Sequence, residues 1–327
     1  MIDVGLDIGA ASMRTDKSIQ TRRKRTASEK AGFRLFLLTL PFFCLYFVFS
    51  YVPLFGWSYS FFDYQAGFKL RDTPFVGLKY FKIPFSNPIL RADILRVIRN
   101  TLVMSFLGIA TSFMPMLFAV FLSEIHVDWY RRTVQTLTTI PNFISWVLIY
   151  AVVWSLFSLN DGFVNNVLIQ LGIIEERINF LGTSRHVWIT QWAYQMWKGL
   201  GWNAIIYISA ITSIDTELYE AASIDGAGRF NLMRYITIPG LMPTFFVLLM
   251  LSLGNLLNSG MDQYFVFQTA MNKEYIEVLD LYVYNQGIRS NNISYATAVG
   301  MLKSIISLIL LFSANHLSKI VRGESIF

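Results

Sequence analysis

The sequence predicts an all-α integral membrane protein with about six transmembrane helices. Of the 327 residues, 54% are hydrophobic and only 15% are charged, whereas soluble domains carry about 25% charged residues. The apolar residues gather in long runs. A helix is the expected spanning form, because lipid cannot satisfy the backbone polar groups, and the strand alternation of a membrane barrel is absent. A large soluble helical protein with a wide core is the alternative.

A helix needs about 20 predominantly apolar residues to cross the hydrocarbon core. The segments that meet this requirement are residues 33–55, 101–122, 138–157, 187–211, 243–261 and 297–321. The fourth segment is the most polar, since two glutamines, a lysine and an asparagine interrupt it. The only cysteine, Cys44, lies in the first segment, where we expect it to act as a small apolar side chain.

Basic residues indicate the orientation. A cluster at residues 22–25, Lys30 and Arg34 abuts the first span. Lys and Arg accumulate on the cytoplasmic side and the first span often dominates, so both termini are expected in the cytoplasm. The cluster could bind nucleic acid, but the adjacent span favours attraction to an anionic leaflet.

This orientation divides the chain. Residues 1–32 form a polar, basic cytoplasmic tail, and residues 33–327 form the transmembrane domain. The expected cytoplasmic loops are 123–135 and 212–242, and the expected outer loops are 56–100, 158–186 and 262–296.

The cytoplasmic loop 212–242 reads TSIDTELYEAASIDGAGRFNLMRYITIPGLM. Asp215 can cap a helix over residues 216–224, because its carboxylate can accept from the free amides of the first turn. Gly226 allows the left-handed conformation that ends a helix. A second helix is expected over residues 230–236, and Pro239 should stop it or start the next element.

The first of these helices offers a small surface. Ala221 and Ala222 would let another backbone approach closely, and charged side chains, including Glu220 and Asp225, surround them. Rigid geometry, a close-contact patch and a charged rim are the properties of a docking surface. An amphipathic loop that lies on the bilayer is the alternative that spacing leaves open.

The motif Glu220-Ala221-Ala222 followed by Asp225-Gly226-Ala227, with the later Ile-x-Ile-Pro239 and Pro243, resembles the EAA loop of binding-protein-dependent ABC importer permeases. The segments FVGLKYF at 75–81 and YATAVGMLKSIISLILLFSANHLSKIV at 295–321 are similar to the maltose and polysaccharide branch of that family. The first 30 residues match nothing in the family. The resemblance otherwise covers most of the chain.

The resemblance implies the type I ABC importer transmembrane architecture. It implies a permease subunit that moves an oligo- or polysaccharide, including an acidic one such as alginate, across the bacterial cytoplasmic (inner) membrane by alternating access. The residues implied to couple to the ATPase are Glu220, Ala221, Ala222, Asp225, Gly226, Ala227 and Pro239. The implied partners are a second homologous permease, two ATPase subunits that bind ATP and Mg²⁺, an extracytoplasmic solute-binding protein and membrane lipid.

Other chemistry has little support in the sequence. No G-x-x-x-x-G-K-[ST] loop is present to hold ATP phosphates, and His126, His186 and His316 lack metal-ligand spacing. We therefore expect no enzymatic activity, cofactor or metal in this chain. Carboxylates are scarce in the spans, which argues against ion-coupled transport. The alternatives are an ATP-independent carrier or channel for a small polar solute, and a membrane enzyme acting on lipid-linked saccharides.

Polar and aromatic side chains inside the spans are candidates for the substrate pathway, since amides and aromatic faces suit sugar hydroxyls and rings. The candidates are Gln191, Trp192, Trp197, Lys198, Trp202, Asn203, Asn255, Asn258 and Lys303. The alternative for each is interhelical hydrogen bonding or an interfacial position. A lysine inside a span is costly, and with few carboxylates nearby Lys198 and Lys303 would favour passage of an anionic saccharide.

Overall fold

The computed structural model describes residues 27–184 and 186–322, so most of the predicted tail lies outside the described residues. The chain divides into two units, Met1–Phe55 and Gly56–Phe327. The described part of the first unit is helix α1 (Ala27–Ser50) and the start of η1 (Val52–Phe61). Every α1 side chain that is described, from Gly32 onward, is exposed, as expected for a span that faces lipid.

The described part of the second unit is helical, with only an isolated bridge between Phe62 and Phe75. Its helices are η2 (Leu70–Asp72), α2 (Lys79–Ser86), α3 (Pro88–Ala110), α4 (Met114–Ser123), α5 (Asp128–Thr139), η3 (Ile140–Phe143), α6 (Trp146–Phe157), α7 (Phe163–Gln170), α8 (Val187–Ile211), α9 (Thr216–Ile224), α10 (Arg229–Leu232), the π-helix η4 (Met233–Thr237), α11 (Ile238–Gly254), α12 (Asp262–Phe267), α13 (Lys273–Ile276), α14 (Leu279–Tyr284), the π-helix η5 (Asn285–Arg289) and α15 (Ile293–Arg322). The predicted all-α class is confirmed.

Within the described residues, four helical runs are long and apolar enough to cross a membrane, or five if a bent helix pair counts as one span. The four runs are Gly32–Phe61, Pro88–Ser123, Arg229–Gly254 and Ile293–His316. They contain most of the predicted first, second, fifth and sixth spans. The predicted fourth span is present as α8 with the expected bounds, but its polar residues leave it less apolar than the four. The count of six stays a prediction.

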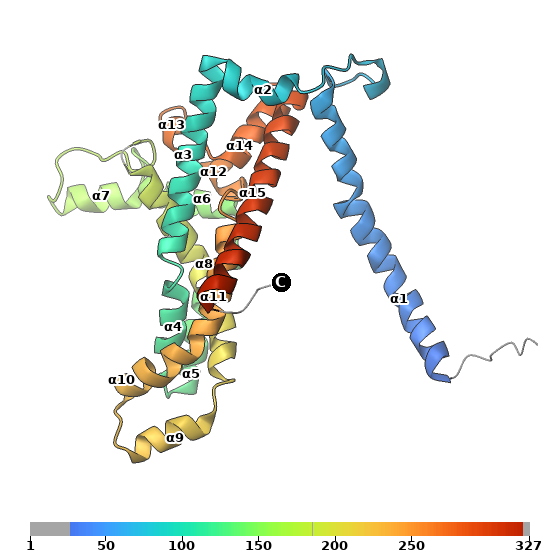
Figure 1. The fold of residues 1–327 in the computed structure, drawn as a ribbon. Helices are drawn as coiled ribbons and strands as arrows, with labels where there is room; N and C mark the ends of the chain where they lie inside the picture. Colours follow the sequence, from blue (N-terminus) through green and yellow to red (C-terminus); the bar gives the residue numbers. More distant parts are fainter. Residues whose placement is uncertain (1–26, 185, 323–327) are drawn as a thin grey trace, which may run out of the picture. The chain divides into compact units, whose positions relative to one another are not determined.

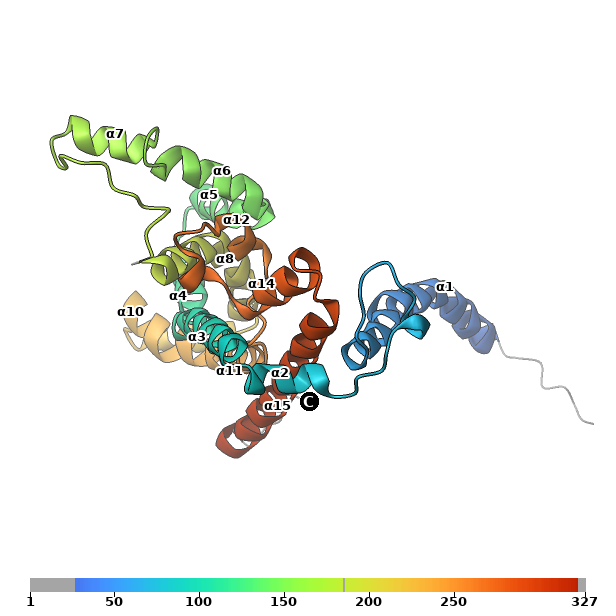
Figure 2. The same ribbon diagram turned by 90° about the horizontal axis from the view of Figure 1, so that it is seen from above.

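The third span is not the single helix that was predicted over residues 138–157. It is divided into Asp128–Phe143 and Trp146–Phe157, whose axes differ by 105°. Pro141 lies at the start of η3, where its ring removes a backbone donor. Ser145 then caps α6, its Oγ accepting from the Leu148 amide. Figure 2 shows α6 and α7 extending sideways from the helices around α8.

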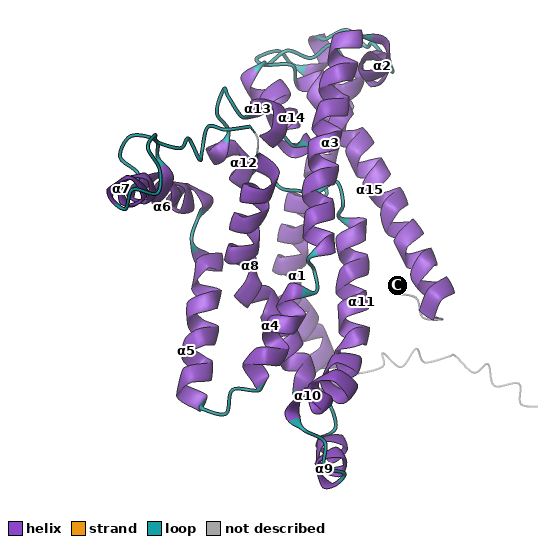
Figure 3. Cartoon of the chain, turned by 90° about the vertical axis from the view of Figure 1, so that its left-hand side faces the viewer, coloured by secondary structure: helices purple, strands orange, loops and turns teal. Residues whose placement is uncertain are grey.

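Helix α8 is central to the second unit and packs against α3, α4, α5 and α11, while α11 also packs against α15. A Cβ on Gly201 of α8 would lie 2.4 Å from the Thr138 carbonyl group, so only glycine allows this approach. Helices α9 and α10 with the residues between them (216–232) are called the α9–α10 loop. This loop lies at one end of the unit, and α2 and α13 lie at the other (Figures 1 and 3).

Candidate functional site

Helix α9 begins and ends through local hydrogen bonds. The Asp215 carboxylate accepts from the Glu217 amide at 3.0 Å, so the cap is where the sequence predicts it. At the other end the Ala227 amide donates to the Ala222 carbonyl at 2.9 Å, and the Gly226 amide donates to the Ser223 carbonyl at 3.1 Å. Together with the φ of 79° at Gly226, this is a Schellman motif. Ala222, Gly226 and Ala227, three residues of the predicted coupling motif, therefore form the C-terminal end of the helix.

The surface of the α9–α10 loop combines charged and apolar side chains. Glu220, Ala221 and Asp225 are exposed, and Ala222 and Ala227 are half-buried. Large apolar side chains that the sequence reasoning missed are also exposed: Leu218 by 53%, Ile224 by 87% and Phe230 by 67%. In the sequence, each of them could have been recognised as an apolar residue next to polar neighbours in a short predicted helix. The result is an apolar surface with a charged rim.

The loop is fixed to the helices that follow it. The Tyr219 hydroxyl lies 3.0 Å from the Thr237 hydroxyl, and Thr237 is 2% exposed. Pro239 lies in the first turn of α11, directly after the π-helix η4, which fits a residue that cannot donate in a regular helical ladder. Proline does not stop the helix here: α10, η4 and α11 form one run from Arg229 to Gly254.

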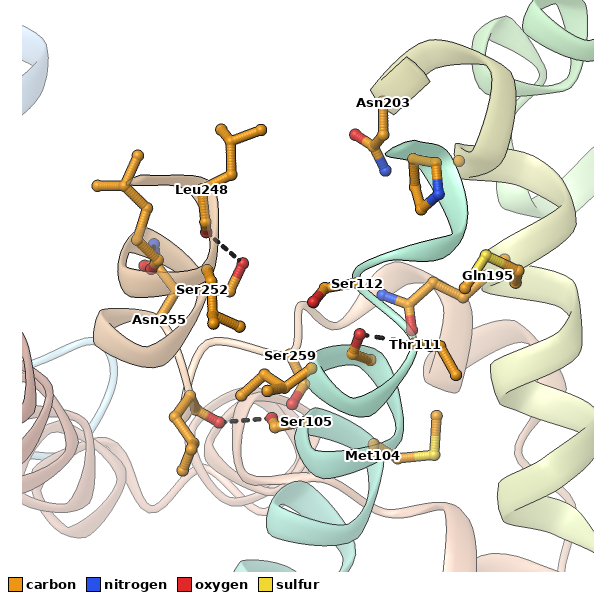
Figure 4. A pocket seen from close by; sticks show the side chains of 18 of the residues that line it. Met104, Ser105, Thr111, Ser112, Gln195, Asn203, Leu248, Ser252, Asn255 and Ser259 are labelled. Carbon is orange, nitrogen blue, oxygen red and sulfur yellow. Dashed lines mark hydrogen bonds between the residues drawn. The ribbon is translucent and has the colours of Figure 1, made fainter. Parts of the chain in front are cut away.

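A cavity of about 440 Å³ lies in the second unit and is lined chiefly by α3, α8 and α11. Figure 4 shows Ser105, Thr111 and Ser112 on one wall, Gln195 and Asn203 on a second, and Ser252 and Asn255 on a third. None of its lining residues carries a charge at neutral pH. The residues that the structure describes contain no cluster of three or more His, Cys, Asp or Glu side chains suited to a metal ion.

Helix α8 presents one face to the cavity. The residues on this face are Trp192, Gln195, Met196, Gly199, Asn203, Ile206 and Tyr207. Their spacing of three, four and seven residues follows the helical period. The Trp192 indole donates to the Thr111 hydroxyl at 2.9 Å. Among the described residues, the exposed amides of Gln195 and Asn203 have no hydrogen-bond partner, so they can donate to and accept from a bound solute.

The segment after α11 supplies the facing polar groups. The Asn258 side chain donates to the Asn255 side-chain oxygen at 3.1 Å, and Asn255 donates to the Leu251 carbonyl at 3.0 Å. The Ser259 hydroxyl is buried and has no hydrogen-bond partner among the residues that the structure describes. Four of the predicted pathway residues, Trp192, Asn203, Asn255 and Asn258, thus line one cavity.

Three other predicted pathway residues do not line the cavity. Gln191 is 4% exposed and accepts two bonds from the Gln263 side chain, one at its backbone oxygen and one at its side-chain oxygen. Trp197 and Trp202 are exposed by 53% and 46%, and Trp202 packs edge-on against Phe143. The Gln191 bonds match the interhelical alternative, and the exposure of the two tryptophans matches the interfacial one.

The two lysines are engaged with the protein. The Lys198 ammonium donates to the carbonyls of Pro141, Asn142 and Ile144 at 3.0, 2.8 and 2.5 Å. These are the carbonyls at the break between η3 and α6. Lys303 forms an ion pair with Asp280, a carboxylate that lies outside the predicted spans.

Comparison with known proteins gives consistent matches. Residues 111–323 match the profile of the family described as binding-protein-dependent transport system inner membrane component. Protein LplB of Bacillus subtilis (strain 168) is 35% identical over 90% of this chain and 91% of its own length. The polygalacturonan/rhamnogalacturonan transport system permease protein YteP of the same organism is 38% identical over 90% of each chain.

Chains of solved structures are also similar to this chain. A chain in the crystal structure of a bacterial ABC transporter involved in the import of the acidic polysaccharide alginate matches with a TM-score of 0.79 and 30% identity, covering 90% of this chain and 98% of that one. A chain of the bacterial alginate ABC transporter in complex with an alginate pentasaccharide-bound periplasmic protein also matches with a TM-score of 0.79 and 30% identity, covering 91% and 98%.

Proposed function

This chain belongs to the family of binding-protein-dependent transport system inner membrane components, and we propose that it is the permease subunit of an ATP-driven importer of oligo- or polysaccharides. Its relatives include sugar permeases of ABC transporters. An acidic polysaccharide is the proposed cargo class, because YteP and the alginate importer are named for such cargoes.

The α9–α10 loop is the observation that carries this proposal. Its exposed apolar side chains, Leu218, Ile224 and Phe230, need a partner surface, and Glu220 and Asp225 form the charged rim around them. The run from Arg229 to Gly254 connects the loop to Leu248 and Ser252 at the cavity wall. A movement of α9 with its partner would therefore reach the cavity, which is the requirement for alternating access.

In this proposal the other components are separate chains. Two ATPase subunits bind ATP and Mg²⁺ and receive α9, with Glu220, Ala221, Ala222 and Asp225 at the contact. Gly226, Ala227 and Pro239 shape the loop. A second homologous permease completes the pathway, and an extracytoplasmic binding protein delivers the saccharide. This chain is a transport subunit and performs no catalysis itself. Both termini and α9 face the cytoplasm, in the inner membrane.

We assign the saccharide pathway to the cavity. Gln195, Asn203, Asn255 and Asn258 supply amide donors and acceptors for sugar hydroxyls, and Trp192 supplies an aromatic face. The remaining candidates act on the protein: Gln191, Trp197, Lys198, Trp202 and Lys303 pack or hold the helices around the cavity. This division is supported by the contacts of Lys198 and Lys303 described above.

The test is a bulky substitution at the exposed Ala221. Ala221→Trp should leave the protein folded and inserted but abolish saccharide uptake and co-purification of an ATPase, because the added ring separates the two surfaces. Ala221→Ser is the matched control and should retain both. Normal uptake by Ala221→Trp, or wild-type uptake that persists with vanadate and without an ATPase, would favour an ATP-independent carrier instead.

A further inference from the structure

The segment that connects α11 to α12, residues 255–261, borders the cavity through Asn255, Leu256, Asn258 and Ser259. It is not a regular helix. Gly260 has a φ of 77°, a conformation that residues with a Cβ rarely adopt. Within the segment the Asn258 amide donates to the Asn255 carbonyl at 2.8 Å, and contacts with neighbouring helices hold the backbone at Leu256 and Gly260.

Two hydrogen bonds from other helices hold the backbone of this segment. Ser105 Oγ of α3 donates to the Leu256 carbonyl at 2.5 Å, and Figure 4 shows Ser105 beneath Ser259. On the other side the Gly260 amide donates to Asp280 Oδ2 of α14 at 3.0 Å. Of the three residues between these two anchors, Asn258 and Ser259 line the cavity.

The carboxylate of Asp280 has two partners, one for each oxygen. Oδ2 accepts from Gly260, and Oδ1 accepts from the Lys303 ammonium of α15. The side chains of Asp280 and Lys303 are only 21% and 13% exposed. A carboxylate in such a place is costly without a counter-charge. Lys303 supplies that counter-charge and leaves the second oxygen available to the loop.

We propose that Asp280 and Lys303 are positioning residues for the saccharide cavity. Asp280 holds Gly260 and thereby places Asn258 and Ser259 at the cavity wall, while Lys303 neutralises the carboxylate. The ammonium of Lys303, which the sequence suggested would attract an anionic saccharide, acts on Asp280. The inference rests on the proposed function only in taking the cavity's occupant to be a saccharide.

Three variants distinguish the role of Asp280 as hydrogen-bond acceptor for Gly260 from the role of its charge. Lys303→Met leaves an unpaired carboxylate. Asp280→Asn with Lys303→Met removes both charges but keeps an oxygen that can accept from Gly260. Asp280→Leu with Lys303→Met removes both charges and the acceptor. The exposed pair Asp128 and Arg131, changed to Asn and Met, is the control for loss of an ion pair elsewhere in the chain.

The first measurement is uptake of a labelled alginate pentasaccharide and of a neutral arabino-oligosaccharide by cells that carry each variant with its native partners. The Asp280→Leu/Lys303→Met variant (the Leu–Met variant) should raise the half-saturating concentration of both up to about tenfold, the size of the effect of losing one hydrogen bond. The Asp280→Asn/Lys303→Met variant (the Asn–Met variant) and the control should keep a half-saturating concentration near that of the wild type. Lys303→Met should have a higher half-saturating concentration than the Asn–Met variant. Loss of alginate uptake alone in Asn–Met would overturn the inference.

The second measurement needs no cargo. In a Cys44→Ser background, the rate at which a polar thiol reagent modifies Asn258→Cys reports the position of the segment. The rate should change several-fold in the Leu–Met variant and stay constant in Asn–Met, while Asp161→Cys, in an exposed loop, reacts equally in both. Equal Asn258→Cys rates in all variants would overturn the inference. If wild-type cells take up neither saccharide, the proposed function fails while these rates still test the positioning role.

Discussion

Gly226 and Gly228 both lie in the short connection between α9 and α10, and they differ in backbone conformation. Gly226 has a φ of 79°, whereas Gly228 has a φ of −74°. A Cβ at either position would meet no atom within 4 Å, so packing does not distinguish them. Only Gly226 needs to be glycine, because only there would a Cβ strain the backbone.

Gly226→Ala should weaken the end of α9 by roughly 1–2 kcal/mol, the cost of placing a Cβ in the left-handed region. Gly228→Ala should change stability by less than about 1 kcal/mol, because the φ of −74° suits alanine while alanine is a poorer N-cap than glycine at the start of α10. Hydrogen–deuterium exchange of the amides of residues 224–227 measures the difference directly, with saccharide uptake as a second readout. Equal exchange in the two variants would contradict the assignment of the Schellman motif.

At the scale of elements, the broken third span illustrates how a membrane protein accommodates an irregular backbone. A break frees carbonyl groups that lipid cannot satisfy. Lys198 of α8 donates to three of them, at Pro141, Asn142 and Ile144, and its ammonium lies 5.4 Å from the centre of the Trp146 ring. One side chain thus fixes the junction between η3 and α6.

Lys198→Met should lower stability by about 1.5–3 kcal/mol, the range for hydrogen bonds to a charged group, measured by thermal unfolding in detergent. Uptake of neutral and acidic saccharides should fall by the same factor, because the contacts of Lys198 are with the protein. Lys319→Met is the matched control, because the Lys319 side chain is exposed. A loss confined to acidic saccharides would instead indicate that Lys198 acts on the cargo.

The sequence could predict features that depend on adjacent residues, but not those that depend on packing between distant segments. The bounds of α9 were predictable because the Asp215 cap and the left-handed Gly226 are effects of adjacent residues. The break after Phe143 was missed because the apolar run of 138–157 masked two real signals, Pro141 and Ser145. The cavity could not be derived, because α3, α8 and α11 meet there through packing that no single segment encodes.

At the scale of the second unit, the α9–α10 loop and α2 lie at opposite ends (Figure 1). The orientation with cytoplasmic termini requires these ends to face opposite sides of the membrane. In a Cys44→Ser background, an impermeant thiol reagent should label Lys82→Cys of α2 in intact cells, and should label Ser223→Cys of α9 only after permeabilisation. Both positions are exposed. The reverse pattern would invert the topology.

The helical run from Arg229 to Gly254 also has a thermodynamic consequence. At 1.5 Å per residue its 26 residues extend about 39 Å, so in the proposed importer one continuous helical run would have the ATPase contact near one end and the cavity near the other. Coupling free energy between two binding sites is reciprocal. If the proposed coupling exists, the factor by which the ATPase state changes saccharide affinity equals the factor by which bound saccharide changes nucleotide affinity, so an empty and an occupied cavity would give the assembly different resting states.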